Sequence, residues 1–472
     1  MNWVILFFCL GFGVLAYKRP DWAVLFLIFA LPAYLIRFNL GMVPFTLLEA
    51  MIWIAFLVWI VKKRKQIKDN LVNTFKGKSG TISYPLSKEI VFLLLVSLLS
   101  VAVAGFSDSA LGVWKAYFLE PLLVFILILN NFQLKKDYQK IIYGLAFSSF
   151  LLAIYAWVQK FTGWGIGNEF WQAEVTRRAT SVFPYPNALA LFLAPLLIVF
   201  WGQICVEFKK RKDDLKKFLS KVFFLFLTII LGLGAIYFAR SEGALIALAV
   251  SGLIFFWFQG GRFRGLVYGA VAAALLFLIF FPAPRLWVTQ KATLNDLSGE
   301  IRKQQWRETW EMLSQDKKTF FLGAGLATYQ KKVAPYHQEG IFYNRDKDPL
   351  FRTKLLLFDQ EYKSEYWQPV EIYLYPHNIF LNFWTELGLA GVLLFAWIII
   401  KLLAVSRRNI ENGDAEDKYL SLGLGGALVV ILVHGLVDVP YFKNDLAVAF
   451  WVLAGLISMI SLKIKYKPDK KN

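Results

Sequence analysis

Long apolar runs separated by short polar segments dominate the sequence. About 20 apolar residues are needed to cross a bilayer, and runs close to that length recur thirteen times. The predicted spans are 2–16, 22–36, 42–61, 89–105, 110–130, 141–159, 186–207, 221–239, 243–258, 265–282, 378–402, 418–436 and 445–462. The first two runs are short and could form a hairpin rather than two full crossings. The pattern predicts an all-α, polytopic transmembrane helical bundle of about 12–13 spans.

One connection differs in kind, because residues 283–376 form a long and nearly neutral polar stretch rich in aromatic residues. A loop of this length is usually functional or disordered, and its aromatic content argues against disorder. Within it, 298–313 predicts a helix with Ser298 as the N-cap and with Trp306, Trp310 and Leu313 on one apolar face. We therefore expect one large, partly helical extracytoplasmic loop.

These boundaries divide the chain into four parts. We expect ten transmembrane helices with short loops in 1–282, the extracytoplasmic loop domain in 283–376, the last three transmembrane helices in 377–462, and a basic cytoplasmic tail in 463–472. Residues 1–16 lack a positively charged start and a cleavage site of small residues, so they are expected to be a first span and not a signal peptide.

The composition agrees with a membrane protein, with 57% hydrophobic and only 18% charged residues. The net charge of +19 would suggest nucleic acid in a soluble protein. Here 31 basic residues lie in one set of alternate connections and the tail, against six in the short connections of opposite parity. Because cytoplasmic loops attract lysine and arginine, the basic side is assigned to the cytoplasm, the long loop to the outside, and no nucleic-acid partner is expected.

The outward side carries the polar residues that are candidates for chemistry. Arg177 and Arg178 precede the seventh span, Arg240 follows the eighth, Arg302 lies on the predicted loop helix, and all three histidines fall on this side. Guanidinium groups bind phosphate oxygens bidentately, and aromatic rings suit the apolar faces of sugars. The alternative is that the arginines reach toward lipid headgroups and the aromatic residues form an interfacial belt.

Three segments carry a resemblance to a known family. Residues 178–187 resemble the Arg-x-x-Gly-x-Phe-x-x-Pro-Asn signature of the O-antigen ligase and polymerase superfamily. The segment with Trp306, Trp310, Gly323-Ala-Gly325 and Tyr329 is similar to that family's outer loop. Residues 376–391, with His377, Asn378 and Glu386-Leu-Gly, are similar to its His-Asn motif and the span that follows. The resemblance covers roughly residues 140–460, with Ser181 in place of the usual glycine and Glu242 where the family commonly has arginine.

The resemblance implies a glycosyltransferase of the bacterial cytoplasmic (inner) membrane, with its large loop facing the periplasm or cell exterior. The implied donor is a saccharide on a polyprenyl (undecaprenyl) diphosphate, and the acceptor is a glycan, a lipid core or a protein. His377 is the expected base, and Arg178 is the first choice for the diphosphate. The expected binding residues are Arg177, Asn187, Arg240, Arg302, Trp306 and Asn378. Ligase, polymerase and protein O-glycosyltransferase activity remain open.

No cofactor or metal is expected. Asp346-Lys-Asp348 has the spacing of an ion site, but it sits among basic residues and is more simply a solvated pair. Buried ionisable residues leave a second class open, a lipid-linked oligosaccharide flippase or other transporter. Lys115 forms a structural ion pair with Glu49 or Glu120, or these residues belong to a proton path. A receptor that only binds glycan is the third class.

Overall fold

In the computed structural model of the chain, the described residues are 3–41, 43–75, 85–132, 137–211, 214–357 and 360–466, with the side chains of 66–75 left out. Most of them are helical, and each of the thirteen predicted spans contains a helix. The predicted tail, 463–472, lies outside the described residues beyond 466. The all-α, polytopic fold class is confirmed.

Nine of the described helices are long and apolar enough to cross a membrane. They are α5–α6 with the π-helical turn η2 (Asp108–Asn131), α7 (Tyr138–Thr162), α9 (Pro186–Lys210), α10 (Leu215–Phe238), α11 (Glu242–Gln259), α12 (Arg262–Phe280), α19 (Ile379–Asn412), α20 (Ala415–Gly435) and α21 (Asn444–Lys465).

The first four helices depart from that length and composition. They are α1 (Trp3–Lys18), α2 (Pro20–Phe29), α3 (Leu47–Phe75) and α4 (Ser87–Val103). The run at 22–36 is helical only to Phe29, after which the 3-10 turn η1 (Leu31–Leu35) and the strands β1 (Arg37–Leu40) and β2 (Val43–Thr46) follow. The chain breaks there because Pro32 removes a backbone donor. α3 continues past its apolar half into the basic run 62–65.

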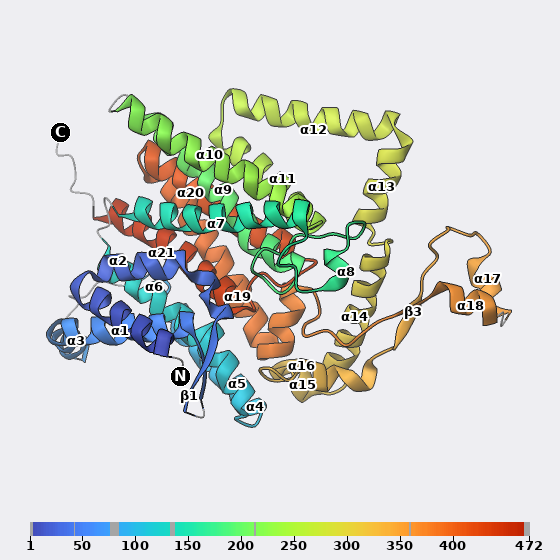
Figure 1. The fold of residues 1–472 in the computed structure, drawn as a ribbon, viewed down its shortest axis with the longest axis horizontal. Coiled ribbons are helices and arrows are strands. Elements are labelled where there is room, and N and C mark those ends of the chain that lie inside the picture. The colour runs from blue at the N-terminus through green and yellow to red at the C-terminus, as the bar shows by residue number, and fades with distance from the viewer. Residues whose placement is uncertain are drawn as a thin grey trace.

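The most buried spans are α9, α20 and α21, which form the centre of the described bundle. α9 and α20 approach closely at Gly202 and Gly423, since a Cβ on Gly202 would lie 2.8 Å from the Tyr419 carbonyl oxygen and 3.1 Å from the Gly423 Cα. Small residues allow such close backbone contact between membrane helices. At the periphery, Figure 1 shows α12 running along the outside of the bundle, and it is the least buried span.

The polar stretch between α12 and α19 folds into short elements. They are α13 (Pro282–Ala292), α14 (Leu297–Ser314), α15 (Lys317–Leu322), α16 (Tyr329–Val333), η3 (Ala334–Tyr336), β3 (Gly340–Phe342), α17 (Phe351–Leu356), α18 (Gln360–Tyr366) and β4 (Trp367–Pro369). Figure 1 shows α14, α15 and α16 beside one end of the bundle, with α17 and α18 projecting away from it beyond β3. The long connection is therefore partly helical, as predicted.

The loop helix α14 is present where expected, but the predicted N-cap is wrong. The Asp296 carboxylate accepts the N-cap hydrogen bond from the Gly299 amide at 3.1 Å. Ser298 is already inside the helix, and its hydroxyl instead accepts a hydrogen bond from Arg302 Nη1 at 2.7 Å. The helix begins two residues earlier than predicted because aspartate is an equally good cap.

The Gly323-Ala-Gly325 segment of the loop and the Glu386-Leu-Gly segment of α19 contact each other, and this contact joins the loop to α19. The Ala324 amide donates to the Thr385 carbonyl at 2.7 Å, and the Ala327 amide donates to Glu386 Oε2 at 2.8 Å. Gly388 has φ +75° inside α19, where a Cβ would meet the Phe321 carbonyl oxygen at 2.3 Å. Only glycine fits this kink, and the kink seats the loop at the start of the span.

The buried charges near the other helices include the predicted ion pair. Lys115 Nζ lies 3.2 Å from Glu49 Oε2, while the Trp53 indole donates to Glu120 Oε1 at 2.8 Å. Glu49 also accepts a hydrogen bond from the Thr46 amide at 2.9 Å. The predicted pairing of Lys115 with Glu49 is confirmed.

Candidate functional site

Four segments that are far apart in the sequence surround one cavity of about 530 Å³ at the loop end of the bundle. They are the connection before α9, the first turns of α14, the segment before α19, and the turn between α20 and α21. The cavity lining includes Arg178, Asn187, Arg302 and His377. Four of the eight candidate residues are therefore brought together.

Arg178 is fixed by the backbone that ends α10. Its Nε and Nη2 donate to the Ala239 carbonyl oxygen at 2.9 and 2.8 Å, and Nη2 also donates to Asn187 Oδ1 at 3.1 Å. The neighbouring Ala179 amide donates to the Phe238 carbonyl at 3.1 Å. Among the described residues Nη1 takes no hydrogen-bond partner, so this edge of the guanidinium is left for a ligand.

Asn187 connects Arg178 to a carboxylate that was not predicted as part of the site. Asn187 Nδ2 donates to Asp438 Oδ2 at 3.0 Å. Asp438 is 1% exposed, and its Oδ1 accepts from the Val439 amide at 2.9 Å and lies 3.7 Å from His377 Nδ1. A chain of polar groups therefore runs from Arg178 to His377 through Asn187 and Asp438.

His377 is held by its backbone and by two rings. Its backbone φ of +46° lies in the left-handed region, which residues other than glycine rarely adopt. The imidazole packs edge-on against Tyr373 and Tyr375, with ring centroids 5.1 and 5.0 Å apart. The side chain is 18% exposed. Strained backbone of this kind is found where the surrounding structure fixes a functional side chain.

Arg302 reaches the cavity from α14. Its Nε donates to the Val437 carbonyl oxygen at 2.9 Å, next to Asp438 in the turn between α20 and α21. The Ser298 hydroxyl holds Nη1 one turn earlier on the same helix. The loop helix is thus tied to the bundle through an arginine that faces the same space as Arg178.

The charged groups around the cavity shift one another's pKa values. Burial, reinforced by the positive charges of Arg240 and Arg302, lowers the pKa of the Arg178 guanidinium. Burial alone would raise the pKa of the Asp438 carboxyl. The neighbouring His377, His434 and Arg302 side chains instead lower that pKa well below the ordinary range of an aspartate. Arg178 and Arg302 give the cavity two guanidinium groups that suit an anion, alongside the carboxylates of Asp438 and Glu371.

Two further cavities continue the first. One of about 290 Å³ shares Arg178, Asn187 and Arg302 with it and adds Arg240 and the buried His434. The other, of about 500 Å³, shares Arg240 with the middle cavity and is walled by Leu245, Ile246 and Trp287. The result is a groove with an aromatic end, a cationic middle and a partly apolar end.

Arg177 and Arg240 are separated from the base candidate. Arg177 lines only the partly apolar cavity, where its Nε donates to the Gln172 carbonyl at 3.0 Å. Arg240 has φ +52° and donates to the Val175 carbonyl at 3.3 Å. Adjacent residues 177 and 178 therefore face different cavities, which the sequence does not reveal.

Trp306 and Asn378 make backbone contacts and line none of these three cavities. The Trp306 indole donates to the Pro376 carbonyl at 2.8 Å. Asn378 caps α19, accepting from the Phe380 and Leu381 amides, and its Nδ2 donates to the Leu436 carbonyl at 3.0 Å. Both residues flank His377 and hold the segment that carries it.

Several lining residues were missed as site residues by sequence reasoning. Asp438 was not among the predicted site residues, and it lies in the turn after α20. Tyr185 and Tyr375 also line the large cavity, and their hydroxyls are 2.9 Å apart. The Tyr-Pro-Asn and Tyr-Pro-His sequences around 185–187 and 375–377 were the available signal.

The Asp-x-Asp pair lies away from this groove. Asp348 accepts hydrogen bonds from Lys354 Nζ at 2.7 Å and the Tyr362 hydroxyl at 2.9 Å, and Asp346 accepts from the Tyr366 hydroxyl at 2.5 Å. Within the described ranges, no group of three or more histidine, cysteine or acidic residues is arranged to hold a metal ion.

Comparison with known proteins confirms the family resemblance. Residues 227–396 match the family model described as O-antigen ligase. A Rickettsia conorii protein, provisionally named a polysaccharide ligase, is 26% identical over 109 residues, which are 23% of each chain. The family match runs from α10 to α19 and so contains Arg240, Arg302 and His377, whereas Arg178 and Asp438 lie outside it.

Proposed function

We propose that the protein is a membrane glycosyltransferase, which moves a saccharide from a polyprenyl-diphosphate donor to a glycan, lipid-core or protein acceptor at the outer leaflet. The observation that carries this proposal is the single cavity lined by Arg178, Arg302 and His377. The similarity to O-antigen ligases supports the same class of reaction.

The groove suggests how such a donor would bind. The cationic middle, with Arg178, Arg240 and Arg302, suits the diphosphate, because guanidinium groups pair with its oxygens and neutralise the charge that grows on the leaving group. The N-terminus of α9 also faces the cavity through Pro186 and Asn187, and its partial positive charge adds to this field.

The two ends of the groove suit the two ends of the donor. Leu245, Ile246 and Trp287 give the partly apolar cavity a surface for the first isoprene units. Trp171, Tyr373 and Tyr375 line the opposite end, where aromatic faces can stack on sugar rings. The donor would lie along the groove with its anomeric carbon near His377.

In the proposed step, the acceptor hydroxyl oxygen attacks the anomeric carbon and a new C–O bond forms. The bond from that carbon to the diphosphate breaks, and the polyprenyl diphosphate leaves with the electron pair. His377 accepts the hydroxyl proton at Nε2, because Nδ1 faces Asp438. The ionised Asp438 orients the imidazole and stabilises its positive charge, in the manner of a carboxylate behind a catalytic histidine. A single displacement inverts the anomeric configuration.

The test is the product made by the purified protein, reconstituted in vesicles, from a synthetic polyprenyl-diphosphate saccharide. Appearance of free polyprenyl diphosphate together with a new glycosidic bond is the expected result. Repeated extension identifies a polymerase, and a single transfer to lipid or protein identifies a ligase. If the donor crosses the bilayer with its diphosphate bond intact, the chain is a flippase and the proposal is wrong.

A further inference from the structure

A second groove lies at the opposite, basic end of the bundle and takes no part in the site described above. It has a volume of about 760 Å³ and lies between α2, α7 and α10. Its apolar lining includes Trp22, Phe26, Phe29 and Phe147, and the rings of Phe29 and Phe147 stack with centroids 5.5 Å apart. This apolar lining, the floor of the groove, suits a hydrocarbon chain.

The rim of the groove is cationic. Lys140, Lys217 and Lys221 line it, and its described lining contains no acidic residue. Lys140 lies 2.6 Å from Asp137, whereas Lys217 forms no ion pair with any residue in the described ranges. Lys140 lies in the first turn of α7, and Lys217 and Lys221 lie in the first two turns of α10, at the end that the distribution of basic residues assigns to the cytoplasm.

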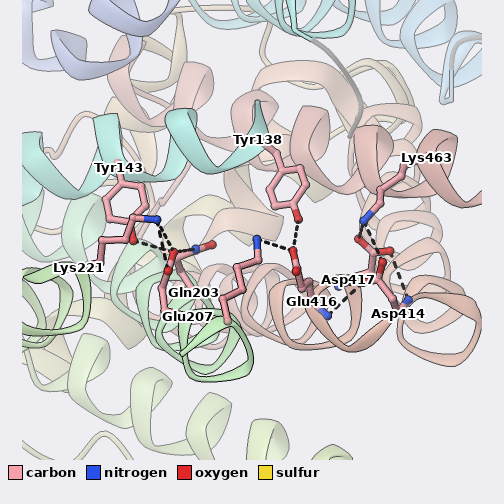
Figure 2. A network of polar contacts seen from close by, with 10 residues as sticks. Tyr138, Tyr143, Gln203, Glu207, Lys221, Asp414, Glu416, Asp417 and Lys463 are labelled. Carbon is pink, nitrogen blue, oxygen red and sulfur yellow. Dashed lines mark hydrogen bonds and ion pairs between the residues drawn. The ribbon is translucent and has the colours of Figure 1, made fainter. Parts of the chain in front are cut away.

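Part of the rim is held in place by a buried carboxylate. Figure 2 shows Tyr143 and Lys221 converging on Glu207, which is 3% exposed. Glu207 Oε1 accepts from the Tyr143 hydroxyl at 3.0 Å, from Gln203 Nε2 at 2.9 Å and from Lys221 Nζ at 3.3 Å. Lys221 and Tyr143 are thus positioned before any ligand arrives, which lowers the entropic cost of binding.

One polar atom in the groove lacks a partner. Gln139 Nε2 is buried and donates to no described protein atom, although it lies beside Lys140 in the lining. A buried donor without an acceptor is costly. An oxygen atom of a bound ligand would satisfy it.

We propose that this groove binds an anionic phospholipid of the cytoplasmic leaflet. Its phosphate lies among Lys140, Lys217 and Lys221 and accepts from Gln139, and an acyl chain lies along the aromatic floor. A soluble anion would leave the apolar floor exposed to water, and a zwitterionic lipid would bring no net negative charge to Lys217, which has no ion-pair partner in the described ranges. Basic pockets beside membrane helices on this side of a bilayer are suited to such headgroups.

The first experiment measures lipid retained by the purified full chain. The protein is placed in nanodiscs of phosphatidylcholine with increasing phosphatidylglycerol, and bound lipids are counted by native mass spectrometry after release into detergent. The double variant Lys140→Ala/Lys217→Ala is compared with Lys216→Ala/Lys465→Ala, which removes two charges from the same end outside the groove. Lys221 is kept because it neutralises the buried Glu207.

The expected result is a loss of phosphatidylglycerol affinity of about fivefold for each groove lysine removed, with little change in the control. Equal losses in both double variants would mean that the lipid is attracted only by the general charge of this end, and would overturn the proposal. Retention of phosphatidylcholine as strong as that of phosphatidylglycerol would also overturn it.

A second variant blocks the groove without changing its charge. Gly144 lines the groove, and a Cβ there has only the Leu25 carbonyl oxygen near it, at 3.8 Å. Gly144→Phe should displace the lipid, while Gly144→Ala should retain it and report that the helix tolerates a side chain. Unchanged lipid binding by Gly144→Phe would contradict the assignment.

A third arm distinguishes a lipid from a free phosphate. Phosphatidylglycerol should raise the thermal unfolding midpoint of the detergent-solubilised protein, whereas glycerol phosphate, which lacks acyl chains, should not. An equal rise with glycerol phosphate would show a simple anion site and reject the lipid. None of these measurements depends on glycan transfer.

Discussion

The His377 imidazole and the Asp438 carboxylate face each other, with Nδ1 and Oδ1 3.7 Å apart, although the two residues lie on different sides of α19 and α20 in the sequence. This separation is longer than a hydrogen bond. Catalytic hydrogen bonds in ligand-free enzymes are often long and shorten when substrate binds. We therefore treat the pair as a base and its orienting group.

Replacement of the base is the first prediction. His377→Ala should lower the turnover of glycan transfer by about 10²–10⁴-fold, the range for removal of a general base. Glu371 is another carboxylate in the cavity lining, so Glu371→Gln is the matched control and should retain most of its turnover. The reverse ranking of the two variants would identify Glu371 as the base.

Replacement of the orienting carboxylate gives a smaller effect. Asp438→Asn keeps the shape of the side chain but removes its charge, so turnover should fall about 10- to 100-fold, as for loss of a hydrogen bond to a charged group. Donor affinity should change little. A variant with full turnover would show that Asp438 serves only to hold Asn187.

The Asp438 carboxylate also predicts a pH dependence of stability. Its pKa is lowered in the folded protein, and an unfolded aspartate titrates near pH 4. Its ionised form therefore contributes stability above about pH 4, and that contribution is lost as the pH falls through the lower, folded-state pKa. The difference in unfolding midpoint between wild type and Asp438→Asn should be constant at pH 5–7 and shrink below pH 4. A difference that grows on acidification would contradict this sign.

Substitution of Trp306 distinguishes a positioning role of this residue from a sugar-binding role. Its indole donates to the Pro376 carbonyl, one residue before His377, so Trp306→Phe should loosen the base and lower turnover by up to about 100-fold. The Michaelis constant should stay close to that of wild type. Trp310→Phe is the control, because Trp310 is 48% exposed and lines none of the three cavities. A raised Michaelis constant with unchanged turnover would indicate direct contact with the sugar.

The contact between α9 and α20 predicts a stability effect without a change in chemistry. Gly202→Ala would force a Cβ against the Tyr419 carbonyl oxygen at 2.8 Å, and overpacking of this kind costs about 1–3 kcal/mol. Gly425 lies on α20, where an added Cβ would have its nearest atom at 3.5 Å, so Gly425→Ala should leave the unfolding midpoint unchanged. Thermal unfolding midpoints compare the two variants, and equal midpoints would contradict the close contact.

The sequence predicts the fold well because each membrane span is a local run of apolar residues. Each of the thirteen predicted runs contains a helix, although the run 22–36 is helical only to Phe29, and α14 is found within two residues of its expected start. The site is harder to read, because it depends on contacts between distant segments. Nothing local indicates that Arg177 and Arg178 face different cavities, or that Asp438 meets Asn187 across 251 positions.

Arg178 and His377 are central to the account, and their separate effects on binding and transfer test it most directly. Donor dissociation constants and single-turnover rates are measured for wild type, Arg178→Lys and His377→Ala, with Arg307→Lys as the control on an exposed arginine of α14. Arg178→Lys keeps the charge but loses the planar fork, so donor affinity should fall about 10- to 100-fold. His377→Ala should bind donor as wild type does and lose transfer. If Arg178→Lys binds donor normally, or His377→Ala transfers at the wild-type rate, the account is wrong.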